Sequence, residues 1–283
     1  MIYLLLSVVC SVTVGVIFKL SRQYNSSAIQ MVATNYAVAI LLCFFFFDFK
    51  FTSLSTAPWA LYVGIGFLLP TVFLFLATSI KQVGIVKTDA AQRLSLFIPI
   101  LAAWLIFDET FNSYKLVALI IGFPAILMIL MKPVSKEKTN LTYPLLVLLG
   151  FGIIDILFKK MALYTTMPFT SSLVVVFSIA LVIMLLVVCY DTVVNSSKIT
   201  LKNILLGGLV GVFNFGNILF YLKAHQVFTA NPSTVFAGMN LGVIILGSVI
   251  GVVVFKEKLS VKNYLGLLIA LIAILLIVLS QQS

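Results

Sequence analysis

Charged side chains are scarce in this chain of 283 residues, and their scarcity argues against a soluble globular fold. Asp, Glu, Lys and Arg together make up only 9% of the residues, whereas 62% are hydrophobic. The mean hydropathy is +1.22. Soluble domains carry roughly 25% charged and about 45–50% apolar residues. The composition therefore predicts a polytopic membrane protein with no separate soluble domain.

Residues that carry metal and catalytic chemistry are equally few. The three cysteines stand at unrelated spacings in apolar segments, and His225 is the single histidine. The chain has no phosphate-binding P-loop, no HExxH or GxSxG motif and no Cys/His cluster. We therefore expect no cofactor, no metal site and no catalytic residue, so the chain is not expected to be an enzyme. An ATP-driven pump is excluded for this chain alone.

Acidic residues are outnumbered by basic ones, 8 against 18, which gives a formal net charge of +10. The basic residues are scattered between apolar runs and form no long basic stretch of the kind that binds nucleic acid. Anionic headgroups attract Lys and Arg that flank a membrane span. We therefore expect membrane lipids, and no nucleic acid, as partners of these charges.

Long apolar runs are what the chain has in abundance. A helix needs about 20 apolar residues to cross the hydrocarbon core, and continuous runs of this length favour helices over a barrel of shorter alternating strands. The fold class predicted is therefore all-α, with ten transmembrane helices. The predicted spans cover residues 2–20, 28–47, 58–80, 84–107, 113–131, 142–163, 169–190, 203–224, 232–255 and 262–280.

A pattern occurs twice along these spans. The segment 17–19 (Ile-Phe-Lys) closes the first span, and 157–159 (Leu-Phe-Lys) closes the sixth, 140 positions later. Glu109 follows the fourth span and Glu257 follows the ninth, 148 positions later. A unit with an odd number of crossings begins on the opposite side of the membrane when it is copied in tandem. The sequence therefore predicts two inverted five-helix repeats, an arrangement typical of solute carriers. The predicted parts are a first repeat over 1–131, a linker over 132–141 and a second repeat over 142–283.

Helix-breaking residues interrupt several spans. Pro70, Pro99 and Pro124 lie inside the third, fourth and fifth spans, where they either shape a helix or allow it to bend during gating. Gly238 and Gly242 lie four residues apart in the ninth span. Small residues at this spacing predict close helix packing.

Ionisable residues within a span are costly and usually face the protein interior or water. Asp155 is the most deeply placed acid, in the sixth span, and Lys159 follows one turn later in the order that favours an ion pair. The pair either lowers the cost of insertion or couples proton binding to solute binding through Asp155. Lys159 and its repeat counterpart Lys19 are candidate substrate-binding residues, although Lys19 could equally reach the membrane interface.

Amide side chains at membrane depth complete the candidate solute site. Gln92 and Asn240 occupy the fourth and ninth spans, 148 positions apart, and Asn214 and Asn217 are predicted to share one face of the eighth. These four amides either bind a polar solute or join helices by hydrogen bonds. His225 is expected at the membrane interface rather than in a proton relay.

These features resemble the EamA type of the drug/metabolite transporter superfamily. The resemblance covers nearly the whole chain and lies in the two five-helix halves and the Glu that follows the fourth and ninth spans. In that family the closing pattern is Gly-Glu before a hydrophobic residue, whereas Asp108 and Lys256 stand here in place of the Gly. The segment 230–233 (Ala-Asn-Pro-Ser) is similar to the family's small-residue entry to the ninth span. The Trp-Gly of the first span is represented by Gly15 alone.

The resemblance implies a secondary active or facilitative transporter that moves a small polar organic solute by alternating access around a central cavity. The solute would be a metabolite, an amino acid or a drug. We expect an integral multi-pass protein of a bacterial inner membrane, as a monomer or a homodimer. The alternatives are a lipid-handling or non-transporting membrane component, and an enzyme with a second acid or a histidine beside Asp155.

The orientation of the chain stays open between two indications. When Lys and Arg are counted over alternate loops, 13 fall on one side and 5 on the other. The positive-inside rule places the richer side in the cytoplasm and both termini outside. Many members of the family are thought to have cytoplasmic termini, which favours the opposite orientation.

Overall fold

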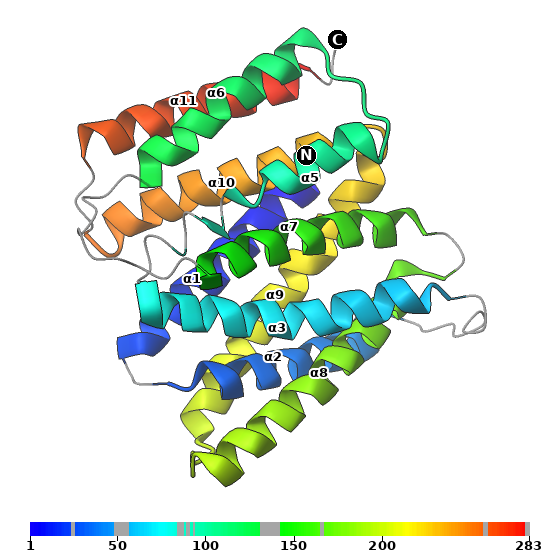
Figure 1. Cartoon of the computed structure of the whole chain (residues 1–283), viewed down its shortest axis with the longest axis vertical. Helices are drawn as coiled ribbons and strands as arrows, with labels where there is room; N and C mark the ends of the chain where they lie inside the picture. The colour runs from blue at the N-terminus through cyan, green and yellow to red at the C-terminus, as the bar shows by residue number, and fades with distance from the viewer. Residues whose placement is uncertain are drawn as a thin grey trace.

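The fold is a bundle of helices, and the described part of the chain contains no strand (Figure 1). The computed structural model describes residues 1–23, 26–47, 57–83, 88, 91–92, 94–130, 142–164, 167–256 and 260–280. The predicted all-α fold is confirmed. The helices are α1 (Ile2–Gln23), α2 (Ala28–Phe46), α3 (Trp59–Val83), α5 (Phe97–Leu105), α6 (Ser113–Leu130), α7 (Thr142–Leu163), α8 (Phe169–Val194), α9 (Leu201–Val227), α10 (Pro232–Val253) and α11 (Val261–Leu279).

Six helices in the described ranges are long and apolar enough to cross a membrane. The corresponding segments are Ile2–Ser21, Ala28–Phe46, Trp59–Leu76, Thr170–Val194, Leu201–Val227 and Pro232–Val253. In α6 and α11 the apolar stretches are shorter, Ser113–Met128 and Val261–Ile277. Nine of the predicted spans therefore coincide closely with helices, since α7 also follows the expected bounds.

The fourth predicted span, 84–107, is the one that differs. Its described helix, α5, has only 9 residues, and a turn at Ser95 and Leu96 precedes it. The ring of Pro99 clashes with the carbonyl four residues earlier, at Ser95, and proline has no N–H to bond it. The Ile98 N–H donates to this carbonyl instead, at 3.0 Å. Pro70 and Pro124, by contrast, lie inside the continuous helices α3 and α6.

Several predicted features lie outside the described residues. These are residues 84–87, 89–90 and 93 of the fourth span, the linker 132–141, and Glu257.

Helix ends recur at a constant offset in the two halves. The helices α5 and α10 end 148 positions apart, and α6 and α11 begin 148 positions apart. Asn112 and Ser260 precede these two starts and cap them, because their side chains accept from the backbone N–H of Lys115 and Asn263 at 2.9 and 3.3 Å. The duplication seen in the sequence therefore extends to the way in which individual helices begin.

The turns after α5 and α10 share an unusual backbone conformation. Asp108 and Lys256 have φ angles of 49° and 52°, in the left-handed region. Glycine enters this region without the steric cost that other residues meet there. This geometry explains why the resembling family has glycine at both places, and shows that the turn forms here without it.

The main contacts between helices also come in pairs. In each pair, every helix of one contact is replaced by its counterpart from the other half. The contact of α2 with α9 corresponds to that of α8 with α3, and the contact of α1 with α9 corresponds to that of α7 with α3. The contact of α1 with α10 likewise corresponds to that of α7 with α5. Three contacts among the described helices join a helix to its own counterpart: α2 packs on α8, α5 contacts α10, and α6 lies beside α11 along one edge of the bundle (Figure 1).

Glycine permits the closest of these approaches. A Cβ on Gly211 of α9 would lie 2.8 Å from Val38 Cβ and 3.0 Å from the Asn35 carbonyl oxygen of α2. A Cβ on Gly66 of α3 would lie 2.7 Å from Cβ of residue 179 and 3.1 Å from the carbonyl oxygen of residue 176, both on α8. The α2 and α8 positions are 141 residues apart in both comparisons. The same backbone contact is therefore built twice.

The predicted packing role is confirmed for Gly238 and Gly242 of α10, whereas a Cβ on Gly247 of the same helix would meet nothing within 4 Å. A Cβ on Gly238 would meet the Leu4 side chain at 2.7 Å, and one on Gly242 would meet the Val8 side chain at 2.9 Å. Both glycines therefore face α1.

Neighbouring glycines on α9 provide a test of this packing. A Cβ on Gly207 would lie 2.7 Å from the Met31 carbonyl oxygen and from Thr34 Cβ, whereas a Cβ on Gly208 would meet nothing within 4 Å. We expect Gly207→Ala to destabilise the protein by about 1–3 kcal/mol, because the added methyl group would displace the backbone of α2 at Met31. Gly208→Ala should leave stability unchanged or raise it by up to about 1 kcal/mol through helix propensity. Unfolding in detergent measures both, and equal effects would contradict the contact.

Candidate functional site

Two buried charges of opposite sign meet where the first half of the chain contacts the start of α10. Lys115 Nζ lies 2.6 Å from Glu109 Oε1 and also donates to Asn231 Oδ1 at 2.8 Å. The backbone N–H and the hydroxyl of Ser233 donate to the Glu109 carboxylate at 2.9 and 2.5 Å. Glu109 and Lys115 are only 3% and 2% exposed, so this ion pair is shielded from its surroundings.

This cluster caps α10. The first turn of a helix has N–H groups without a partner inside the helix, and Pro232 has none to offer. The Glu109 carboxylate satisfies the Ser233 N–H and lies at the positive end of the helix dipole. From sequence, Glu109 marks only the end of a span, and Lys115 attracts no notice. The helix start at Asn231 is the signal that could have revealed them, since its donors require an acceptor.

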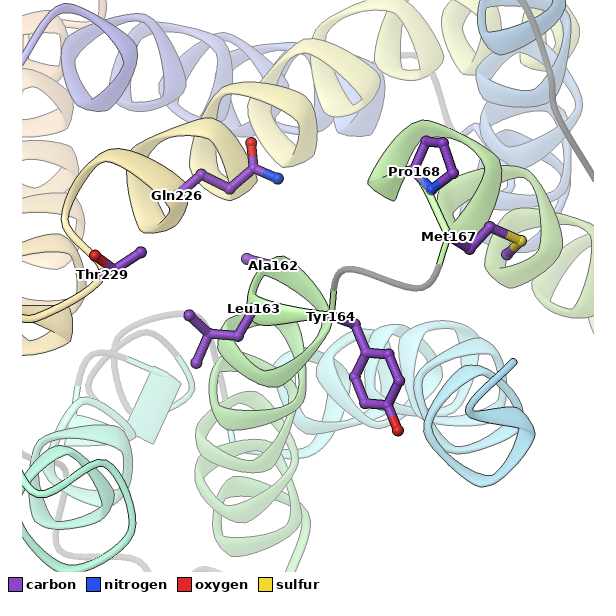
Figure 2. Close-up of a pocket in the computed structure, with 7 residues that line it drawn as sticks. All are labelled: Ala162, Leu163, Tyr164, Met167, Pro168, Gln226 and Thr229. Carbon is purple, nitrogen blue, oxygen red and sulfur yellow. The ribbon is translucent and has the colours of Figure 1, made fainter. Parts of the chain in front are cut away.

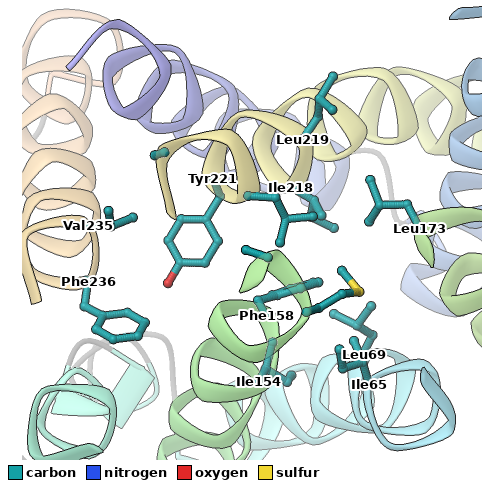
Figure 3. Close-up of a cluster of buried hydrophobic side chains, with 14 of the residues drawn as sticks. Ile65, Leu69, Ile154, Phe158, Leu173, Ile218, Leu219, Tyr221, Val235 and Phe236 are labelled. Atoms are coloured by element: carbon teal, nitrogen blue, oxygen red, sulfur yellow. The ribbon is translucent and has the colours of Figure 1, made fainter. Parts of the chain in front are cut away.

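Asp155 lies on α7 and accepts a hydrogen bond from the Tyr221 hydroxyl of α9 at 2.9 Å. Figure 3 shows Tyr221 reaching from α9 toward α7 in a cluster of buried apolar side chains that includes Phe158 and Phe236. The rings of Phe158 and Tyr221 meet edge to face, with centroids 6.3 Å apart. A phenol hydroxyl in aromatic surroundings therefore holds the carboxyl group.

The ion pair expected between Asp155 and Lys159 does not form. Lys159 is fully buried, and its Nζ donates to the carbonyl oxygen of Thr229 at 2.9 Å, beyond the end of α9. The spacing of four residues brings the two side chains to one face of α7, but each finds its partner on another part of the chain. The neutralised pair predicted from the sequence is therefore wrong for this structure.

His225 is buried rather than interfacial, which corrects the sequence-based expectation. Its ring lies edge to face with Tyr221 and Phe236, at centroid distances of 4.6 and 4.8 Å. Neither ring nitrogen has a hydrogen-bond partner among the described residues. The apolar rings around it explain the burial, because aromatic edges and faces pack well against imidazole.

A cavity of about 520 Å³ opens at the ends of α7 and α9 (Figure 2). Pockets that bind small ligands commonly enclose about 300–1,000 Å³. Thr229, whose carbonyl binds Lys159, belongs to the lining, so the buried lysine lies directly behind one wall. The lining residues are Ala162, Leu163, Tyr164, Met167, Pro168, Gln226 and Thr229.

Three of the four candidate amides join or brace helices. The Asn214 amide donates to Asn35 Oδ1 of α2 at 3.0 Å, and Asn217 Oδ1 accepts from the Ser7 hydroxyl of α1 at 2.8 Å. The two residues thus face different helices, although their spacing predicted one face. The Asn240 amide donates to the carbonyl of Phe236 within α10 at 3.1 Å.

Gln92 is half-buried, and its backbone carbonyl accepts from the hydroxyl of Ser95 at 2.6 Å. Among the described residues, no hydrogen bond joins the side chain of Gln92 to Asn240. No three His, Cys, Asp or Glu side chains gather as metal ligands would in the portion of the chain that the structure covers.

The two candidate lysines make equivalent contacts across the halves. Lys159 Nζ lies 6.0 Å from the ring centroid of Phe107, which follows α5, and Lys19 Nζ lies 3.9 Å from that of Phe255, which follows α10. Phe107 and Phe255 are 148 positions apart. Lys19 is exposed, however, whereas Lys159 is buried. The duplicated contact is therefore present in two different environments.

The charge pair at α10 yields a prediction for stability. Glu109→Gln removes the negative charge that compensates the buried Lys115, and breaking such a pair costs about 3–5 kcal/mol. The double variant Glu109→Gln with Lys115→Met should recover much of this loss, because no unpaired charge remains. Asp108→Asn, at the exposed neighbour, is the matched control and should have little effect. Denaturant unfolding in detergent measures all three, and equal stability of Glu109→Gln and the control would refute the cap.

Comparison with known proteins agrees with this architecture. Residues 1–131 match the EamA-like transporter family. An uncharacterized protein of Haemophilus influenzae is 39% identical over 282 residues, which cover 96% of this chain and 95% of the relative. A protein crystal structure with 11% sequence identity has the same fold, with a TM-score of 0.72 over 99% of this chain and 97% of the other. The chain belongs to the EamA-like transporter family, whose members are membrane transporters of the drug/metabolite type, and it is an integral multi-pass membrane protein.

Proposed function

We propose that the protein is a secondary active or facilitative transporter that moves a small polar organic solute across a bacterial inner membrane by alternating access. The observation that carries this proposal is the difference between Lys19 and Lys159. Both lie over the counterpart aromatic ring of the other half, yet one is exposed and the other buried. Two repeats that have the same fold but different conformations can exchange those conformations. The exchange would open a central cavity first to one side of the membrane and then to the other.

The start of α10 supports the same proposal. The cap on α10 uses Ser233 and Lys115 around Glu109. The counterparts of Ser233 and Lys115, 148 positions away, are Ile85 and Asn263, which supply neither that hydroxyl nor that charge. The sequence therefore does not repeat this set of side chains in the other half. We propose that the cap on α10 favours the present conformation when no solute is bound.

The pairing of helix contacts supports the inverted arrangement of the halves. Tyr36 of α2 and Phe177 of α8 are counterparts 141 positions apart, and their rings lie 6.2 Å apart. A two-fold axis that exchanges the halves would pass between them. With five crossings in each half, such an axis lies in the plane of the membrane.

The candidate residues divide into two groups under this proposal. Asp155 and Lys159 hold ionisable groups inside the bundle and are proposed to act on a proton and on the solute. Lys19 would take the place of Lys159 in the opposite conformation. Gln92 is kept as a solute-binding candidate.

The remaining candidates, Asn214, Asn217 and Asn240, already have hydrogen-bond partners within the bundle. They would reach a solute only by exchanging those partners. The lipid-handling alternative requires amides on the outer surface, whereas Asn214 is 7% exposed. The large apolar side chains that are exposed, such as Phe45, are the surface that we propose meets lipid.

Transport by the purified protein tests the proposal. Proteoliposomes should accumulate at least one solute from a panel of amino acids, organic acids and sugars when a pH gradient is imposed. Asp155→Asn should abolish accumulation driven by the gradient while leaving exchange intact, because the carboxyl that would carry the proton is lost. Asp108→Asn is the control for loss of an acid and should behave as wild type. If no solute moves and none raises the melting temperature, the protein is not a carrier.

The inverted arrangement has its own test. Reporters fused after Glu109 and after Glu257 should report opposite faces of the membrane, because each ends the fourth crossing of its repeat. The same face for both would exclude inverted repeats. A third fusion after Ser283 reports the side of the membrane on which the C-terminus lies. The positive-inside rule places the C-terminus outside the cytoplasm.

A further inference from the structure

Lys159 is a buried cation without a carboxylate at ion-pair distance among the described residues. An ammonium has three donors, and the contacts of Lys159 use one of them, on the Thr229 carbonyl. The two acids nearest in the fold are already engaged: Glu109 binds Lys115 and Ser233, and Asp155 binds Tyr221. Leaving a buried charge uncompensated is strongly destabilising. Its presence is therefore evidence for a group that compensates it during function.

His225 adds a second set of unused polar atoms at the same place. It is fully buried and both of its nitrogens lack a hydrogen-bond partner among the described residues. Buried polar atoms are nearly always bonded, so such an exception requires an explanation. Lys159 lies within electrostatic range of the His225 ring and of Glu109. The ring of Tyr221 packs against His225, and the hydroxyl of Tyr221 binds Asp155.

The 520 Å³ cavity lies next to Lys159, because Thr229, whose carbonyl oxygen binds the Lys159 ammonium, belongs to its lining. Lys159 precedes the lining residues Ala162 and Leu163 by about one helical turn, and His225 precedes the lining residue Thr229 by the same interval. Both residues are fully buried and neither belongs to the lining, so they lie behind it on α7 and α9. Figure 2 shows that Thr229, which bonds Lys159, stands opposite Leu163 across the opening.

We infer that Lys159 and His225 form the binding site for the carboxylate of a small organic anion that enters through this cavity. The inference rests on the carrier function proposed above and specifies its class of solute. The carboxylate would accept hydrogen bonds from the free ammonium donors and from an imidazole N–H. The rings of Phe107, Tyr221 and Phe236 would surround an apolar body attached to it.

The count of charges favours a carboxylate over a phosphate ester. Arginine, with its planar fork, is the residue best suited to bidentate binding of phosphate. The described site offers one uncompensated lysine and one imidazole, which match a single negative charge. No arginine is among the described residues that form the site.

Matched acids and amides test the site on the full-length protein in detergent. Acetate, butyrate, hexanoate and benzoate are compared with their amides by thermal shift and by calorimetric titration. We expect at least one acid to raise the melting temperature and its amide to have no effect. Lys159→Gln should weaken binding of that acid at least about tenfold, as loss of a charge-assisted hydrogen bond does. Lys160→Gln, at the exposed neighbouring position, should bind as wild type.

Further outcomes separate this site from the carrier function itself. His225→Asn should also weaken binding, which keeps the test valid if Lys159→Gln does not fold. Equal binding of acid and amide, undiminished binding by Lys159→Gln, or stabilisation by phenyl phosphate and by none of the carboxylates would overturn the inference. If no acid binds while proteoliposomes transport another solute, the anion site is wrong and the carrier stands. If nothing is bound or transported, both are wrong.

Discussion

The backbone contact of α9 with α2, repeated by α3 with α8, is the constraint on which the rest of the structure depends. Within lipid no hydrophobic force drives helices together, so association relies on close packing and on hydrogen bonds between helices. Gly211 and Gly66 provide the close packing in both places. Because each contact joins a helix of one half to a helix of the other, the halves interlock instead of lying side by side. The segments that carry Asp155 and Tyr221 are brought together as a consequence.

Two buried lysines show how differently the fold treats the same charge. Lys115 is neutralised by Glu109, and the pair stabilises the start of α10. Lys159 has a carbonyl and an aromatic ring as its described partners, next to a histidine whose nitrogens are unused. The paired charge of Lys115 is typical of a structural contact. The charge of Lys159, which has no carboxylate partner among the described residues, is what we expect of a ligand site.

Much of the fold was predictable, and the failures have identifiable causes. Long apolar runs predicted the bounds of nine helices of the described chain, because the cost of an unpaired backbone in lipid leaves few alternatives to a helix. The fourth span is interrupted by a turn at Ser95 and Leu96, since a proline inside an apolar run disrupts a helix without lowering its hydropathy. The pairing of Asp155 with Lys159 failed because the spacing rule describes an isolated helix. Tyr221 and Thr229, distant in sequence, compete for the same side chains.

The sequence by itself determined the all-α membrane fold and the short list of polar residues within it, and it predicted two five-segment halves. Those conclusions need only composition, run length and a repeat offset, all of which are properties of the chain alone. Only the tertiary structure decided which polar residues are used by neighbouring helices and which are not. Hydrogen bonds between helices depend on rotation and depth, to which hydropathy is blind. Lys19 and Lys159 are equivalent in sequence and differ in burial for this reason.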